Sequence, residues 1–581
     1  MKARRRFWFV IGLLVSLLGL FTGCAPTITL SGAAKSTTES APALTDEHVV
    51  TLTLLHMNDV YEITPVAGGT QGGLARVATV RKELLTKNRN TFTILAGDLF
   101  NPSAMGTAQV GGKPLNGRHI VDVMNVVGLD YATFGNHEFD LSRKQFLKRL
   151  SESKATWFSS NTFDARRQPF PNVPAHVVFT VSNHAKHTAR VGLFGLTTIS
   201  NQSDYVRYAD PLEKAREQVA ALRGQVDILI AVTHLSTDED MRLVEASPEI
   251  DLVIGGHEHE NIQQWRGPNL TPIVKADANA RTVYVHDFMF NTATRTLEMV
   301  SRLRKITSDI PEDPAVAARV KGWVEQAFAG FRAQGFEPER VVAMLPEPLD
   351  GTEASVRHRA TCLTELIGQG MLHSVPNAEW AVYNAGSIRI DDVLLSGNIT
   401  EYDIIRTLPF GGTVLAVDMK GTLLQRVLAQ GMTNRGTGGF LQTFNPSNQP
   451  IQPDRTYLVA INDFLLTGRE RDLPYLTRDN PDLRVRPEGA PYVDIRQALI
   501  AELRRQYPVQ AMRRPTLSGS RGAATPDGQA LLPTLPQHET APPDRCLSKV
   551  WPAVRMCRSL LIPGFHPLLQ PCELLLVRHR L

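Results

Sequence analysis

Residues 134–140 read FGNHEFD, and from Asn136 to Asp140 they place an amide, an imidazole and two carboxylates within five positions. This stretch follows an apolar run, so we expect its polar groups to lie at the end of a buried strand. A metal or catalytic site is therefore predicted here.

Four further stretches have the same construction, a short apolar run rich in β-branched residues that ends in a metal-type ligand. They are 49–57 followed by Asn58-Asp59, 91–96 followed by Gly97-Asp98, 226–233 followed by His234, and 250–254 followed by Gly255-Gly256-His257-Glu258-His259. Such runs are typical of buried strands. In open α/β sheets, ligands bind beyond the carboxyl ends of the strands. We therefore expect all five strand ends to meet at one site.

Composition and length favour a globular protein of two large domains with tails. The chain has 581 residues, of which 43% are hydrophobic and 21% charged, and these are globular values. Its formal net charge is only +4. A charge so small for this length argues against a nucleic-acid polymer or an anionic surface as partner of the folded body.

The N-terminus predicts export. Lys2 and Arg4 to Arg6 precede an apolar run, 7–21, that is too short for a comfortable membrane span, and Thr22-Gly23-Cys24 follows. This order is typical of a secretory signal. The Gly-Cys pair resembles the lipobox of bacterial lipoproteins, which implies lipidation of Cys24 and a membrane-anchored or periplasmic location. An ordinary cleaved signal or an uncleaved anchor is the alternative.

The chain divides into six segments. They are a signal peptide (1–24), a flexible linker rich in Ser, Thr, Ala and Pro (25–48), an α/β domain (49–306), a connecting helix (307–340), a smaller α/β domain (341–512) and a low-order tail (513–581). Asp313-Pro314 is a helix-start signal, and this helix either bridges the domains or closes the first one. The tail is either disordered or an aberrant translated extension.

The ordered motifs resemble the 5′-nucleotidase family. The first domain supplies Asp59-x-Tyr61, Gly97-Asp98, Gly135-Asn136-His137-Glu138, His234 and Gly256-His257-x-His259; the second supplies 384–389 (NAGSIR), 439–442 (GFLQ) and 462–465 (NDFL). The resemblance covers nearly everything from Thr51 to about Leu503. It implies a four-layer α/β/β/α metallophosphoesterase domain followed by a smaller α/β substrate-binding domain.

The resemblance also implies two divalent metal ions. Asp98 would bridge them, with Asp59 and His259 on the first ion and Asn136, His234 and His257 on the second. Carboxylates suit hard ions and imidazole suits Zn, Mn, Fe or Co, so Zn, Mn, Co, Fe and Mg are not distinguished.

Further residues carry roles in the family that transfer by position. His137, oriented by Asp140, would contact the phosphate and stabilise charge or protonate the leaving oxygen. The substrate-binding positions are Arg357 and Arg389 for the phosphate, Asn384 near the base, Phe440 and Phe464 around the base, and Glu470 at the ribose.

Two positions depart from the family pattern. Tyr61 stands where the family usually has His, and it either coordinates as phenolate, stands back while water or His259 completes the shell, or leaves a weak first metal. Glu470 replaces the usual Asp, which changes the reach of the group that would hold the sugar.

The expected function is metal-dependent hydrolysis of extracytoplasmic nucleotides by a dimetal-activated water. In the family the second domain rotates about the connecting helix to close the site. Two alternatives remain: a dimetal hydrolase of another ester, such as a cyclic nucleotide, a sugar nucleotide or a thiosulfohydrolase-like substrate, and a nucleotide-binding lipoprotein with a degenerate metal site.

Overall fold

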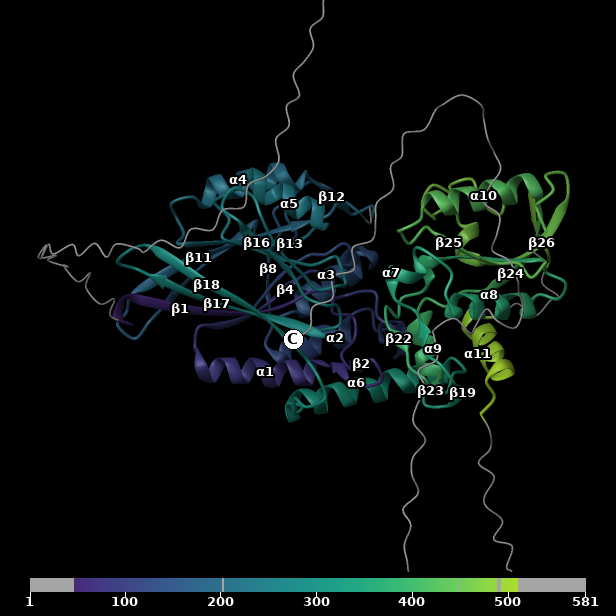
Figure 1. Cartoon of the computed structure of the whole chain (residues 1–581), viewed down its shortest axis with the longest axis horizontal. Coiled ribbons are helices and arrows are strands. Elements are labelled where there is room, and N and C mark those ends of the chain that lie inside the picture. The colour runs from purple at the N-terminus through teal and green to yellow at the C-terminus, as the bar shows by residue number, and fades with distance from the viewer. Residues whose placement is uncertain (1–45, 201–202, 448, 488–492, 510–581) are drawn as a thin grey trace, which may run out of the picture.

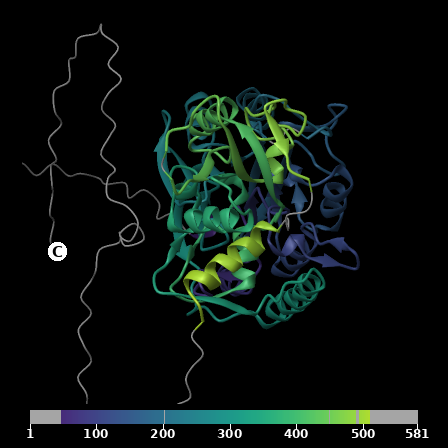
Figure 2. The ribbon, with the colours of Figure 1, turned by 90° about the vertical axis from the view of Figure 1, so that its right-hand side faces the viewer.

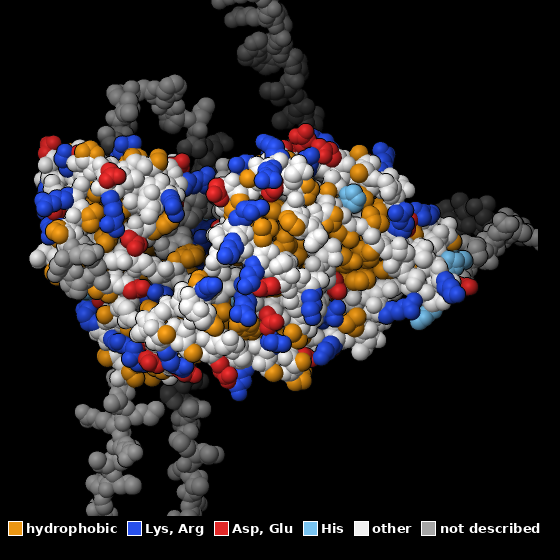
Figure 3. All heavy atoms as spheres, turned by 180° about the vertical axis from the view of Figure 1, so that it is seen from behind, with side chains coloured by type: hydrophobic (Ala, Val, Ile, Leu, Met, Phe, Trp, Pro, Cys, Tyr) orange, Lys and Arg blue, Asp and Glu red, His pale blue; other side chains and the backbone are white. Residues whose placement is uncertain are grey.

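The structure is a computed structural model that describes residues 46–200, 203–447, 449–487 and 493–509. The predicted signal peptide with Cys24, most of the linker and the tail from residue 513 lie outside the described residues. Two α/β domains stand side by side (Figure 1), and the view onto the second domain has helix α11 in front (Figure 2). Acidic and basic side chains are interspersed over the face in Figure 3.

Two six-stranded sheets form the first domain. The first sheet has the order β18-β17-β1-β4-β7-β8, with strands Val49–Met57 (β1), Thr91–Ala96 (β4), Tyr131–Thr133 (β7), Thr156–Trp157 (β8), Thr282–Asn291 (β17) and Thr296–Lys305 (β18). The second has the order β10-β11-β13-β14-β16-β15, with strands His176–Ser182 (β10), Thr188–Thr197 (β11), Ile228–His234 (β13), Leu252–Gly255 (β14), Ile262–Arg266 (β15) and Thr271–Lys275 (β16). Strands β1, β4 and β7 run parallel, as do β11, β13 and β14.

The two sheets pack face to face through apolar side chains, and helices cover their outer faces. Leu54 and Ile94 of the first sheet pack against Leu193 and Ile230 of the second. The outer faces are covered by Leu74–Lys87 (α1), Arg118–Val127 (α2) and Arg143–Glu152 (α3) on one side and by Pro211–Leu222 (α4) and Thr237–Ala246 (α5) on the other. The result is the predicted α/β/β/α arrangement, in which each fully buried aliphatic side chain contributes about 1.5–3 kcal/mol.

The second domain is built on a five-stranded sheet of order β25-β21-β26-β24-β27. Its elements are Glu353–Val356 (α7), Cys362–Ser374 (α8), Trp380–Asn384 (β21), Glu401–Thr407 (α9), Val414–Lys420 (β24), Gly421–Thr433 (α10), Leu441–Phe444 (β25), Thr456–Asn462 (β26), Leu483–Val485 (β27) and Ile495–Gln506 (α11). Two-stranded pairs complete both domains: Pro65–Val66 with Gln71–Gly72, Gln109–Val110 with Lys113–Pro114, Thr162–Asp164 with Val206–Tyr208, Val341–Leu345 with Gly397–Thr400, and Leu349–Asp350 with Val393–Leu394.

Helix α6 (Pro314–Ala333) contacts both domains. It begins as predicted, with Pro314 in its first turn and the Asp313 side chain accepting the Val316 N–H. Trp323 donates to Asp122 of α2 over 2.7 Å, whereas the Phe328 ring lies 4.9 Å from the ring of Tyr402 in α9. Because it packs on both sides, α6 is the bridging helix. Within the described residues, no helix combines the length and apolarity needed to cross a bilayer.

Candidate active site

The predicted ligands lie at the carboxyl ends of the central strands of both sheets. Asp59 follows β1, Asp98 follows β4 and Asn136 follows β7 in the first sheet. His257 and His259 follow β14 in the second, and His234 is the last residue of β13. The predicted strand stops at residue 233, whereas the observed strand includes His234, because this residue still pairs with Thr197 of β11.

The ligand atoms converge in a buried space. His234 Nε2 lies 3.3 Å from Asp98 Oδ2 and 3.9 Å from Asp59 Oδ1, and all three side chains are buried. The His257 ring lies 5.2 Å from the His234 ring, between centroids. Buried carboxylates and imidazoles this close together are the donor set that borderline divalent ions take. This cluster therefore fits a metal site.

The backbone is held in unusual conformations at these ligands. Asp59, Asp98 and His257 have φ of 51°, 57° and 83°, in the left-handed region that non-glycine residues rarely adopt. Each costs about 1–3 kcal/mol, and such residues cluster at functional sites. Hydrogen bonds join these loops: Val60 N donates to Asp98 O over 3.0 Å, and His257 N donates to Asp59 Oδ2 over 3.0 Å.

Glycine is required at position 135, where the backbone lies against the Asp98 side chain. A Cβ atom at this position would lie 2.0 Å from Asp98 Oδ1, far inside contact distance. Only glycine lets the loop after β7 approach the carboxylate that is predicted to bridge the two ions.

The charges of the cluster are mutually dependent. Burial alone would lower the pKa of His234, but Asp98 and Asp59 raise it to about 9. Burial likewise raises the pKa of Asp98, but the neighbouring His234 and His137 hold it below its usual range. Burial and His234 lower the pKa of His257 to about 4, so this imidazole is neutral at pH 7 and able to coordinate.

Tyr61 points into the cluster. Its single hydroxyl proton is shared between Asp98 Oδ2 at 3.0 Å and Asp59 Oδ1 at 3.1 Å, and the hydroxyl oxygen lies 3.2 Å from His259 Nε2. Ligands about 2.0–2.2 Å from one ion are spaced by about 3.0–3.5 Å, so the four groups can surround a metal. Burial, Asp98 and Asp59 raise the pKa of Tyr61 well above 10, so a metal held by this oxygen must displace its proton.

His137 and Asp140 form a pair at the edge of the cluster. His137 Nδ1 lies 2.7 Å from Asp140 Oδ2, and the backbone N–H of His137 donates to Asp98 Oδ1 over 2.8 Å. Asn101 also donates to Asp140 Oδ2 over 2.8 Å. The carboxylate contacts the imidazole at Nδ1 and so orients the ring.

Glu138 joins two ligand loops. Its buried carboxylate accepts the backbone N–H groups of four residues, which are Asp98 (3.0 Å), Leu99 (2.6 Å), Phe100 (3.1 Å) and Gly135 (2.6 Å). The acidic residue next to His137 was the available signal in the sequence, but three of its four N–H donors lie 38 to 40 residues away in the loop after β4.

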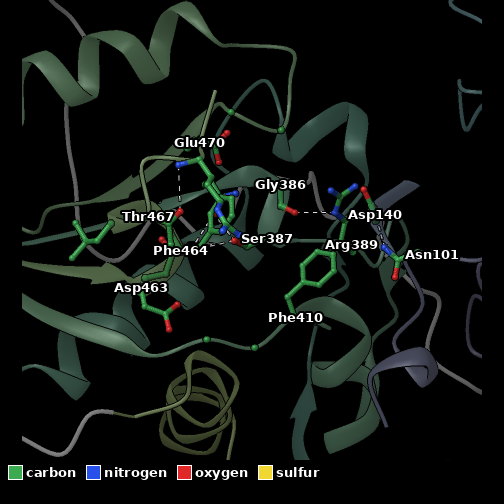
Figure 4. A pocket seen from close by; sticks show the side chains of 18 of the residues that line it. Asn101, Asp140, Gly386, Ser387, Arg389, Phe410, Asp463, Phe464, Thr467 and Glu470 are labelled. Carbon is green, nitrogen blue, oxygen red and sulfur yellow. Dashed lines mark hydrogen bonds between the residues drawn. The ribbon is translucent and has the colours of Figure 1, made fainter. Parts of the chain in front are cut away.

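A cavity of about 1120 Å³ lies between the domains beside this cluster. The first domain contributes Asn101, Asn116, Phe139, Asp140, Leu141, Gln145 and Ser203; the second contributes, among others, Asn384, Arg389, Phe410, Phe464, Arg469 and Glu470. In Figure 4, Arg389 and Phe410 are drawn on the same side of the view as Asp140 and Asn101, and Phe464 and Glu470 on the other side. The Arg389 guanidinium carbon lies 5.6 Å from the Phe410 ring centroid.

The second-domain predictions divide into two groups. Asn384, Arg389, Phe464 and Glu470 line the cavity, and the Phe464 side chain is 40% exposed. Phe440 is buried, and Arg357 pairs with Glu353; neither is among the lining residues.

Phe410 was missed by sequence reasoning. It is 52% exposed and lies in the loop before β24, where the aromatic side chain followed by Gly411-Gly412 was the available signal. An exposed aromatic ring at a cavity wall points to ligand contact.

Two family models match this chain. Residues 52–261 match the model of the calcineurin-like phosphoesterase family, and residues 341–447 match that of the 5′-nucleotidase C-terminal domain. Among curated relatives, the trifunctional nucleotide phosphoesterase YfkN of Bacillus subtilis is 27% identical over 72% of this chain, which spans only 32% of YfkN. Snake venom 5′-nucleotidase of Naja atra is 24% identical over 72% of this chain and 90% of its own length.

A solved structure shows the same fold. The 5′-nucleotidase precursor of Thermus thermophilus superposes with a TM-score of 0.63 at 23% identity, over 79% of this chain and 97% of that one. Both domain models match in the order that the structure shows. The chain therefore belongs to the 5′-nucleotidase family of phosphoester hydrolases, with a calcineurin-like phosphoesterase domain followed by a 5′-nucleotidase C-terminal domain.

Proposed function

We propose that this chain hydrolyses the phosphomonoester of nucleotides at the boundary between its two domains, with two bound divalent metal ions. One observation carries the proposal. Asp140, the partner of His137, lines the same cavity as the exposed Phe464 and Arg389. The carboxylate that orients His137 and a ring able to stack on a base therefore face the same cavity.

Two donor sets of the cluster fit the metals. Asp59, Tyr61, Asp98 and His259 would hold the first ion, and Asp98, Asn136, His234 and His257 would hold the second. When bound, divalent ions activate water at neutral pH and neutralise charge on the phosphoryl oxygens. The buried, neutral His257 suits this task, because an imidazole must be unprotonated to coordinate.

The remaining residues bind and orient the substrate. Arg389 lies beside Phe410 on the cavity wall, and its guanidinium suits a phosphate because it offers several N–H donors in one plane. Phe464 offers its face to a base. Glu470 lies next to Gly439 and, by the family resemblance, would accept hydrogen bonds from the ribose hydroxyls.

His137 would complete the reaction. Water forms a bond to phosphorus, the bond from phosphorus to the ester oxygen breaks, and that oxygen takes a proton as the nucleoside leaves. His137, held by Asp140 through Nδ1, would supply this proton.

The N-terminal sequence supports an extracytoplasmic, lipid-anchored location as a further part of the proposal. Lys2 and Arg4 to Arg6, the apolar run and Gly23-Cys24 are the support. Expression of the full chain with Cys24→Ser is the test. The variant should lose incorporation of labelled palmitate and leave the membrane fraction, and unchanged labelling would reject the anchor.

The activity is tested with the full chain, stripped of metal and reloaded with Mn²⁺ or Co²⁺. Phosphate should be released from AMP faster than from glycerol phosphate, which lacks a base. Equal rates on both would favour the hydrolase of another ester. Tight AMP binding without turnover in Mg²⁺, Mn²⁺, Co²⁺ or Zn²⁺ would favour a nucleotide-binding protein.

A further inference from the structure

The imidazole of His259 contacts both domains. On one side, Nε2 lies 3.2 Å from the Tyr61 hydroxyl and 3.5 Å from Asp59 Oδ1, within the ligand cluster. On the other side, Nδ1 lies 2.8 Å from Asp391 Oδ2 and 3.0 Å from Glu353 Oε2. Asp391 and Glu353 belong to the second domain, although every predicted metal ligand belongs to the first.

Asp391 is itself held firmly in place. Its Oδ1 accepts the Glu353 N–H over 2.8 Å. From the first domain, Arg281 donates to the Asp391 carbonyl over 2.9 Å and lies 3.4 Å from Oδ2. The carboxylate is therefore fixed by groups of both domains.

The backbone of Asp391 is also unusual. Its φ is 39°, in the left-handed region that residues with a side chain rarely adopt. Such a conformation persists where surrounding contacts determine it, and here it aims the carboxylate at His259.

We propose that Asp391 is a positioning residue that makes the second domain part of the first metal site. With metal bound, the His259 Nδ1–H would donate to Asp391, and the Nε2 lone pair would face the space beside Asp59 and Tyr61. A ligating histidine commonly donates its other N–H to a carboxylate in this way, and removal of that partner weakens metal binding about 10–100-fold. The inference rests on the proposed function, because it requires a metal that His259 can hold.

This contact couples metal binding to the arrangement of the domains. If the second domain moved away, His259 would lose the carboxylate that orients it, and the first site would bind metal more weakly. The coupling is reciprocal, so metal bound at the first site stabilises the domain arrangement described here.

Mn²⁺ binding to the metal-stripped full chain tests the proposal, with free Mn²⁺ measured by electron paramagnetic resonance and no substrate present. The test variant is Asp391→Gly, because glycine accepts the left-handed backbone. The matched control is Asp392→Gly. Asp392 is the next residue and also reaches the first domain, where its Oδ2 accepts the Ala67 N–H over 2.8 Å, but that contact involves no predicted metal ligand.

Asp391→Gly should weaken one of the two Mn²⁺ sites by about 10–100-fold, and Asp392→Gly should leave both sites unchanged. Asp391→Asn keeps an oxygen acceptor and should recover part of the loss. In a His259→Ala background, Asp391→Gly should cause no additional loss, because the two residues act as one unit.

Unchanged affinity in Asp391→Gly, an equal loss in Asp392→Gly, or additive losses in the double variant would overturn the proposal. Failure of the proposed function gives a different result. If Asp391→Gly weakens Mn²⁺ binding as expected while no phosphomonoester is hydrolysed, the positioning role stands and the nucleotidase does not. A wild-type chain that binds no Mn²⁺ would overturn both.

Discussion

The Tyr61 hydroxyl lies 3.0 Å from Asp98 Oδ2, the carboxylate oxygen that also lies nearest to His234 Nε2. One oxygen thus faces the phenol and the imidazole, which belong to different metal positions. Of the three roles that the sequence allows for Tyr61, standing back from the cluster disagrees with this contact. The other two roles, a phenolate ligand and a weakened first site, both depend on whether the Tyr61 hydroxyl loses its proton.

Replacement of Tyr61 by histidine should strengthen metal binding at the first site. The phenol must lose a proton whose pKa is raised by burial, Asp98 and Asp59, and this costs about 1.4 kcal/mol for each unit between the pH and the pKa. The imidazoles of His234 and His259, beside the same carboxylates, have a pKa of about 9, so an imidazole at position 61 should lose its proton at pH 8 at a smaller cost than the phenol. We expect Tyr61→His to bind one Mn²⁺ at least about tenfold more tightly at this pH, measured by chelator competition. Equal or weaker binding would contradict the account.

Metal affinity should rise with pH up to about 9. Although burial opposes it, neighbouring carboxylates raise the pKa of both His234 and His259 to about 9, so these imidazoles hold protons at pH 7 in the metal-free protein. Each displaced proton contributes up to about a tenfold gain in affinity per pH unit. Calorimetry in buffers of different ionisation enthalpy should detect proton release at pH 7, and a flat affinity profile from pH 6 to 8 would refute the assignment.

The stability of the metal-free protein should change in the opposite direction. A folded-state pKa above the unfolded value of 6.5 contributes stability that is fully present below pH 6.5 and is lost as the pH rises through about 9. The thermal midpoint of metal-free protein should therefore fall between pH 6.5 and 9, and saturating Mn²⁺ should reverse the trend.

Glu138→Gln should destabilise the fold and loosen the metal site together. The carboxylate accepts four backbone N–H groups, whereas the amide nitrogen of glutamine would face N–H donors. A cost of about 2–3 kcal/mol is expected, seen as a lower thermal midpoint with weaker Mn²⁺ binding. Glu298→Gln, on an exposed position of β18, is the control and should change neither. A midpoint as high as that of the control would remove the role given to Glu138.

Phe464→Ala should raise KM for AMP without affecting a substrate that lacks a base. The ring is 40% exposed at the cavity, and a stacked base contributes about 1–3 kcal/mol, or about 5–150-fold in KM. KM for glycerol phosphate should stay unchanged. Trp265→Ala, an exposed aromatic on β15 outside the cavity lining, is the control. Equal changes for both substrates would show that Phe464 does not contact the base.

Much of the fold and of the ligand cluster can be predicted from the sequence, because the same local pattern recurs: a short apolar run that ends in a metal-type ligand. The predicted strands 49–57 and 91–96 have the observed bounds, since buried β-branched runs stop where polar residues must leave the sheet. Parallel pairing then brings the ends of β1, β4 and β7 together, so ligands about 40 residues apart in the chain meet without any long-range signal.

Contacts between loops cannot be predicted from the sequence in the same way. The partners of Glu138 are backbone groups, which carry no residue signature. Asp391 contacts His259, which lies 132 residues away in the sequence. The left-handed backbone at Asp391 is not predictable from the local sequence. Phe440 and Phe410 are both aromatic residues beside glycines, but only the packing of the second domain buries the first and exposes the second.

The most direct test of the central claim is phosphate release from AMP by the full chain, metal-stripped and then reloaded with Mn²⁺ or Co²⁺, beside His137→Ala. The account predicts turnover that requires added metal and falls about 10²–10⁴-fold in the variant, while the metal content of the variant stays at the wild-type level. Turnover that survives in His137→Ala, or no turnover by wild-type chain with both metals bound, would contradict it.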